Sequence, residues 1–96
     1  MRRYDSLMSN REQILAIAAR HGARHVRVFG SVVRGEDGPE SDVDLLVEFE
    51  PGRGLLNHAA LIEELQDLLG CKVDVASNNG LKPRIKQRVI EEAVAL

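Results

Sequence analysis

The chain has 96 residues, enough for one domain with a core of its own and too few for two ordinary domains. A hydrophobic fraction of 44% and a charged fraction of 29% are typical of globular proteins and exclude wholesale disorder. The 13 basic and 15 acidic side chains give a net charge of −2, so we expect no direct nucleic-acid binding.

Composition also predicts where the protein works. No apolar run approaches the ~20 residues that a membrane span needs, and the first seven residues lack the apolar stretch of a signal peptide. The lone cysteine, Cys71, has no partner for an internal disulfide, which fits a reducing compartment. We therefore expect a cytoplasmic protein with no membrane partner.

We expect a single domain over residues 1–96, with 1–8 as a flexible N-terminal segment. Ser9 and Glu12 have the spacing of a capping box, which predicts the start of the first helix. The helices are predicted where apolar residues recur every three or four positions, and the strands where apolar and polar residues alternate. The expected elements in chain order are a helix over 10–21, a strand over 24–29, a short helix over 31–35, a turn-rich stretch over 36–41, a strand over 42–49, a helix over 57–69, a strand over 72–76, a turn at 78–80 and a final helix that Pro83 opens.

Strands that alternate with helices indicate an α/β fold, a small mixed sheet flanked by helices. Because side chains alternate faces along a strand, one face of the strand over 42–49 is apolar and the other carries most of its acids. The predicted core side consists of Val43, Leu45, Val47 and Phe49, and the opposite side of Asp42, Asp44, Leu46 and Glu48. The predicted buried face of the final helix consists of Ile85, Val89, Ile90, Ala93 and Val94.

Asp42 and Asp44 are the first candidate functional residues. Two residues apart on a strand, they point the same way with Cα atoms roughly 7 Å apart. Unpaired like charges repel, and a divalent cation with oxygen ligands is the natural partner for them. Asp74 lies between two core-type valines on a later strand, so it would join them if the two strands were neighbours. Three carboxylates are able to hold two Mg²⁺ ions for phosphoryl displacement.

Gly30 and Ser31 follow the strand that precedes these acids. Glycine at a strand end lets a ligand approach the backbone closely, and exposed amides at a helix start suit a phosphate. Arg34 is placed to bind phosphate, or to pair with Glu36 or Asp37. We predict a nucleotide site at Gly30, Ser31 and Arg34.

The run from Gly30 to Val47, G-S-V-V-R-G-E-D-G-P-E-S-D-V-D-L-L-V, resembles the minimal nucleotidyltransferase family of the DNA polymerase β-like superfamily. That family is marked by G-S, about ten residues, then D-x-D, with a third acid on a later strand. The residues that carry the resemblance are Gly30, Ser31, Arg34, Gly35, Ser41, Asp42, Asp44 and Asp74. Val33 stands where many relatives have alanine, and this difference does not affect the predicted metal site.

The resemblance implies that Asp42 and Asp44 bind two Mg²⁺ ions, with Asp74 as a ligand of the catalytic metal. It implies that Gly30 and Ser31 hold the β- and γ-phosphates of ATP while a hydroxyl attacks the α-phosphorus. Members of this size are typically antitoxins encoded beside an RNase toxin with a HEPN domain. They silence the toxin by transferring AMP to one of its tyrosines.

The predicted elements leave few residues for a substrate-binding domain, so we expect a partner protein to present the hydroxyl that accepts AMP. Two other functions stay open. The first is a non-catalytic antitoxin that neutralises its partner by binding and occlusion. A metal-dependent nuclease would use similar acids but does not explain Gly30 and Ser31.

Overall fold

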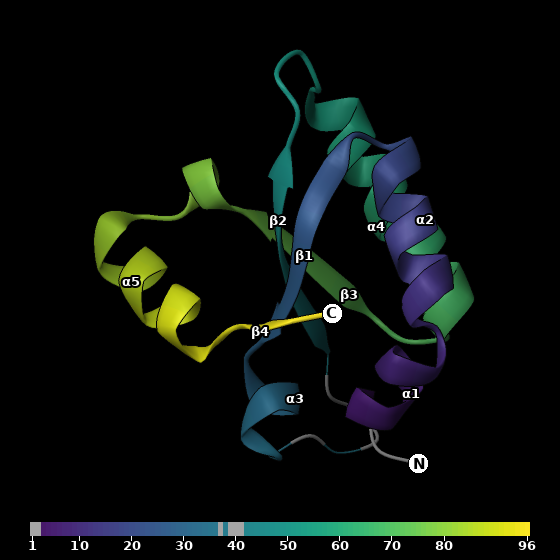
Figure 1. Ribbon diagram of the computed structural model, residues 1–96, viewed down its shortest axis with the longest axis vertical. Helices are drawn as coiled ribbons and strands as arrows, with labels where there is room; N and C mark the ends of the chain where they lie inside the picture. Colours follow the sequence, from purple (N-terminus) through teal and green to yellow (C-terminus); the bar gives the residue numbers. More distant parts are fainter. Residues whose placement is uncertain (1–2, 37, 39–41) are drawn as a thin grey trace.

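The structure is a computed structural model that describes residues 3–36, 38 and 42–96. Its elements alternate in the order that the sequence predicts, with two small additions at the ends (Figure 1). They are α1 (Arg3–Ser9), α2 (Arg11–Arg20), β1 (Ala23–Phe29), α3 (Ser31–Arg34), β2 (Val43–Phe49), α4 (Leu55–Leu69), β3 (Val73–Ser77), a 3₁₀ turn at Asn78–Gly80, α5 (Pro83–Glu92) and β4 (Val94–Ala95).

The sheet has four strands in the order β3-β2-β1-β4. β1 pairs antiparallel with β2 and β4, whereas β2 and β3 are parallel and are joined through α4. This is the crossover that parallel strands require. The predicted α/β fold with a mixed sheet and flanking helices is confirmed.

The main core lies between the sheet and the pair α2 and α4, which cover one of its faces (Figure 1). The β2 residues predicted to face it, Val43, Leu45 and Val47, are buried, and Phe49 packs at its margin. Leu46, on the opposite face, is buried as well. The acidic side of β2 is therefore partly covered rather than open.

The N-terminal segment differs from its prediction. Residues 3–9 form α1, and Leu7 is fully buried in the core, so the flexible segment expected over 1–8 is wrong for residues 3–8. The capping box is wrong too. Ser9 ends α1, Asn10 takes the N-cap position of α2, and its side-chain amide donates to the Ser6 carbonyl oxygen at 2.8 Å. A capping residue needs a non-helical backbone, and Ser9 is still part of α1.

α5 begins at Pro83 as predicted, but most of its predicted buried face is exposed. Only Val89 is buried; Ile85 is 51% exposed and Ile90 38%. The helix ends at Glu92, and Val94 belongs to the edge strand β4. Apolar periodicity identifies a stripe on a helix, yet it does not say whether the rest of the chain covers that stripe.

Within the described ranges, no helix combines the length and apolarity needed to cross a membrane.

Candidate active site

Gly30 follows β1 directly and has a backbone conformation that other residues do not adopt. Its φ of 81° and ψ of −153° lie in a region that is essentially restricted to glycine. Phe29, the preceding residue, pairs with Asp44 of β2, so Gly30 lies against the Asp44 side chain. A Cβ at Gly30 would fall 3.2 Å from Cγ of Asp44 and would overlap one of its carboxylate oxygens. The geometry thus demands glycine for two independent reasons.

Asp44 and Asp74 stand side by side on neighbouring parallel strands. The register of β2 and β3 aligns Asp44 with Asp74, as the sequence required for a shared site, and places both on the face opposite the main core. Asp74 is exposed and Asp44 half-buried, and Asp42, also half-buried, immediately precedes β2. The three acids that the sequence singled out therefore lie near the same end of the sheet.

Burial raises the pKa of Asp44 above its ordinary value, and the negative charges of Asp74 and Asp42 raise it further. The cation of Arg34 opposes this effect. Lys72 is 4.0 Å from Asp42, a weak contact between exposed groups. Burial and, to a lesser degree, the neighbouring acids therefore disfavour the charged form of Asp44.

The metal prediction is only partly supported by this geometry. Carboxylate oxygens on adjacent strands are the donor type that Mg²⁺ prefers, and the crowded charge on Asp44 suits a cation. Among the residues that the structure describes, however, no three His, Cys, Asp or Glu side chains are arranged as a ready metal-binding group. The carboxylates of Asp42, Asp44 and Asp74 are suitable Mg²⁺ ligands by chemical type. That all three bind the metal stays a prediction.

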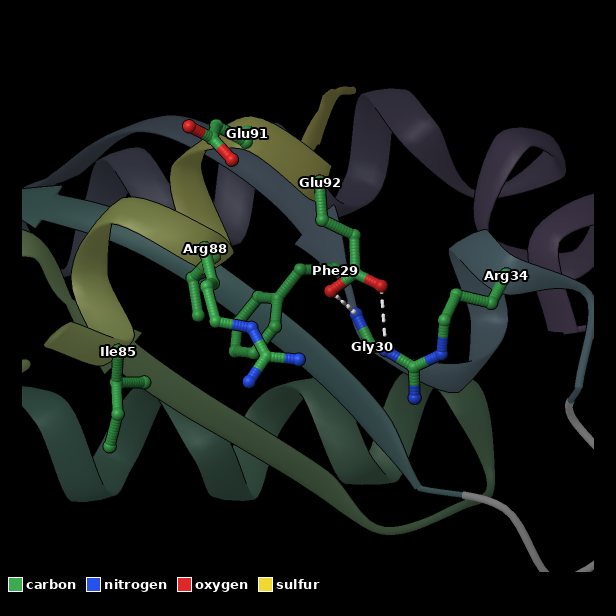
Figure 2. Close-up of a pocket in the computed structure, with 8 residues that line it drawn as sticks. Phe29, Gly30, Arg34, Ile85, Arg88, Glu91 and Glu92 are labelled. Carbon is green, nitrogen blue, oxygen red and sulfur yellow. Dashed lines mark hydrogen bonds and ion pairs between the residues drawn. The ribbon is translucent and has the colours of Figure 1, made fainter.

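Arg34 and the Gly30 amide share a partner that sequence reasoning missed, Glu92 at the end of α5. Arg34 Nη1 lies 2.6 Å from Glu92 Oε1, and the Gly30 N–H donates to Glu92 Oε2 at 3.2 Å (Figure 2). The hydrogen bond with Glu92 is the main cause that raises the pKa of Arg34, followed by the one with Glu36. No spacing in the sequence connects Glu92 to Gly30, because 62 positions separate them.

These groups border a surface pocket of about 690 Å³ between the sheet and α5, within the size range of ligand sites. Figure 2 shows Arg34 and Arg88 converging on it from opposite sides. The lining includes Phe29, Gly30, Arg34, Arg88, Val89 and Glu92.

The remaining predicted residues are placed as follows. Ser31 is the first residue of α3, and Gly35 ends that helix in the left-handed conformation. Arg34 makes the predicted ion pair with Glu36, at 3.2 Å. Asp37 and Ser41 lie outside the described residues. Glu48 lies toward the other end of β2 from Asp44, where it contacts His25 and Asn78.

Comparison with known proteins agrees with the fold and the motif. Residues 11–96 match the family model described as the nucleotidyltransferase domain. The chain is 47% identical over 75 residues to protein adenylyltransferase MntA of Thermococcus cleftensis, covering 78% of this chain and 76% of that one. It is 40% identical over 84 residues to a Methanocaldococcus jannaschii protein whose name provisionally assigns the same activity, covering 88% of this chain and 90% of the relative.

Solved structures give the same result. One described provisionally as a minimal nucleotidyltransferase superposes with a TM-score of 0.90 at 52% identity, over 100% of this chain and 97% of the other. A toxin–antitoxin structure with AMP-PNP shares the fold alone, with a TM-score of 0.78 at 19% identity over 90% of this chain and 71% of the other. The chain therefore belongs to the nucleotidyltransferase domain family and is an enzyme of the nucleotidyltransferase class.

Proposed function

We propose that this enzyme transfers AMP from ATP to a hydroxyl, a tyrosine side chain, of a partner RNase toxin with a HEPN domain, and so acts as its antitoxin. The observation that carries the proposal is the register of Asp44 with Asp74 beside Gly30. Acids on one side and amide and guanidinium donors on the other suit a substrate with both phosphates and bound cations. The relatives named as protein adenylyltransferases support the choice of a protein acceptor.

Asp42, Asp44 and Asp74 are the residues that would hold Mg²⁺, as two ions. When bound, these ions would neutralise the triphosphate and polarise the reacting phosphoryl group. They would also stabilise the charged form of Asp44, whose pKa is raised by burial and by the neighbouring acids.

The other residues act on the nucleotide directly. The Gly30 amide, the Ser31 hydroxyl and the Arg34 guanidinium donate to its phosphate oxygens and orient the α-phosphorus toward the acceptor. The acceptor oxygen then forms a bond to the α-phosphorus as the bond to pyrophosphate breaks. The Asp74 carboxylate, exposed beside Asp44, accepts the hydroxyl proton.

A toxin partner is supported by the fold shared with solved toxin–antitoxin structures, three of which are described as MntA paired with its partner. We propose that the partner is encoded by the adjacent gene and that both proteins work in the cytoplasm. The partner's tyrosine, rather than a small metabolite, would enter the site from the open side of Asp74.

The test is neutralisation of the partner's RNase activity by the Asp42→Asn, Asp44→Asn double variant. We expect the double variant to leave the RNase active, whereas Asp67→Asn, an exposed acid on α4, neutralises it like the wild type. If the double variant still binds and silences the partner, transfer is not the mechanism and occlusion replaces it.

A further inference from the structure

The donors assigned to the nucleotide's phosphates are already engaged by an anion of the chain itself. Glu92 accepts from the Gly30 amide with one carboxylate oxygen and pairs with Arg34 through the other (Figure 2). A carboxylate that bridges a backbone amide and a guanidinium makes the same contacts as two oxygens of a phosphate. Both donors belong to the motif from which the nucleotide site was predicted.

The backbone holds Glu92 in this place. It is the last residue of α5, and β4 follows after one residue. Val94 pairs with Val28 of β1, and the Leu96 amide donates to the Val26 carbonyl oxygen at 3.1 Å. β4 therefore fixes the end of α5 against the strand that leads into Gly30. The side chain of Glu92 is 25% exposed, so it has a route to solvent by rotation alone.

Besides its two donors, Glu92 lies near Asp44, where its charge adds a minor repulsion to that of Asp74 and Asp42. Its contacts with Gly30 and Arg34 are thus the interactions that keep it in the pocket.

We propose that Glu92 is a built-in competitor for the nucleotide: its carboxylate occupies the phosphate-binding donors Gly30 and Arg34 and rotates away when the triphosphate binds. The proposal rests on the proposed function, because it concerns the phosphates of the same nucleotide. Apparent affinity for ATP is lowered by the fraction of molecules in which Glu92 fills the site. The nucleotide-free protein gains a partner for Arg34 in return.

The test uses Glu92→Gln, which removes the charge at nearly constant shape, and Glu63→Gln as its control. Glu63 is exposed on α4, away from the pocket, so its variant makes the same change of net charge without freeing either donor. Each full-length protein is titrated with a non-hydrolysable ATP analogue and Mg²⁺ by calorimetry, and its melting temperature is measured with and without the analogue.

We expect Glu92→Gln to bind the analogue about threefold to fivefold more tightly than the wild type, as loss of one partly exposed ion pair allows. Its melting temperature without ligand should fall by about 1–4 °C while the ligand-induced rise becomes larger. Glu63→Gln should match the wild type. A competitor is the case in which the variant is less stable without ligand but binds the analogue more tightly. Replacing a purely structural residue would lower both the stability and the affinity.

Equal or weaker binding by Glu92→Gln overturns the proposal, and weaker binding assigns Glu92 to holding the nucleotide or its cations instead. Glu92→Asp, which keeps the charge and shortens its reach, is a second variant that should also bind more tightly than the wild type. If neither wild type nor variants bind the analogue, the nucleotide site itself is refuted and the proposed function falls with it.

Discussion

Asp44 fills the space in which a side chain at Gly30 would lie. The two residues are adjacent because Phe29, at the end of β1, pairs with Asp44 across the sheet. The positive φ of Gly30 and the Asp44 carboxylate, which occupies the position of a Cβ, each require glycine at this place.

The first prediction is that Gly30→Ala damages both stability and nucleotide binding. A Cβ there would be strained by the backbone conformation and would displace the Asp44 carboxylate. We expect a loss of roughly 2–4 kcal/mol in the free energy of unfolding, measured by urea denaturation. Gly52→Ala is the matched control, because φ is 88° there but the space is open. Its loss should be about 1 kcal/mol, and an equal loss in both variants would show that the Asp44 contact has no role.

The second prediction concerns the charge on Asp44 in the metal-free protein. Since the folded-state pKa of Asp44 is raised above its ordinary value of 3.8, the folded state binds this proton more tightly than the unfolded state. The contribution to stability is fully favourable below pH 3.8 and is lost as the pH rises through the raised folded-state pKa. In EDTA at neutral pH, Asp44→Asn should therefore be more stable than the wild type.

Urea midpoints measured for the two proteins across that pH window check this expectation. The advantage of Asp44→Asn should shrink as the pH falls toward 3.8. A variant that is less stable than the wild type at neutral pH would mean that the carboxylate is favourably paired in the folded state.

The third prediction separates catalysis from stability at Asp74. Because its side chain is exposed, Asp74→Asn should change the free energy of unfolding by less than about 0.5 kcal/mol. Loss of the proposed proton acceptor and metal ligand should lower the rate of AMP transfer by about a hundredfold or more. Single-turnover transfer from labelled ATP measures this, with Asp67→Asn as the control. An unchanged rate of AMP transfer in Asp74→Asn would show that Asp74 has no role in catalysis.

The fourth prediction is that α1 belongs to the folded domain. Leu7 is fully buried, so Leu7→Ala should cost about 2–5 kcal/mol in the free energy of unfolding. Met8, its neighbour, is 42% exposed, and Met8→Ala should cost less than about 1 kcal/mol. Chemical denaturation of the two variants gives the comparison. Similar small losses for both would return α1 to the flexible segment that the sequence indicated.

The sequence predicted the sheet and the acids well because both depend on local patterns. Alternation along residues 42–49 separates Val43 and Leu45 from the acids Asp42 and Asp44. The parallel register of β2 and β3 then aligns Asp74 with Asp44. α1 was missed because its single buried contact, Leu7, gives a short segment no periodicity to detect. Whether α5 covers its own apolar stripe depends on how it docks on the sheet, which its periodicity does not encode.

Glu92 illustrates the limit most clearly. Its position depends on the pairing of β4 with β1. β4 has only two residues, too few to give a recognisable strand pattern in the sequence. Arg34 had two predicted roles, phosphate binding and ion pairing; the structure confirms the pairing with Glu36, and phosphate binding stays a prediction. Only the tertiary fold brings Glu92 and Arg34 together.

The central claim is nucleotidyl transfer to a protein, and intact-mass spectrometry of the partner toxin tests it most directly. The proposed partner toxin is incubated with this enzyme, ATP and Mg²⁺, its intact mass is measured, and any modified residue is located by peptide fragmentation. We expect one or more AMP increments on a tyrosine of the toxin, absent with EDTA or with the Asp42→Asn, Asp44→Asn variant. An unmodified toxin that is nonetheless silenced by the enzyme would contradict it.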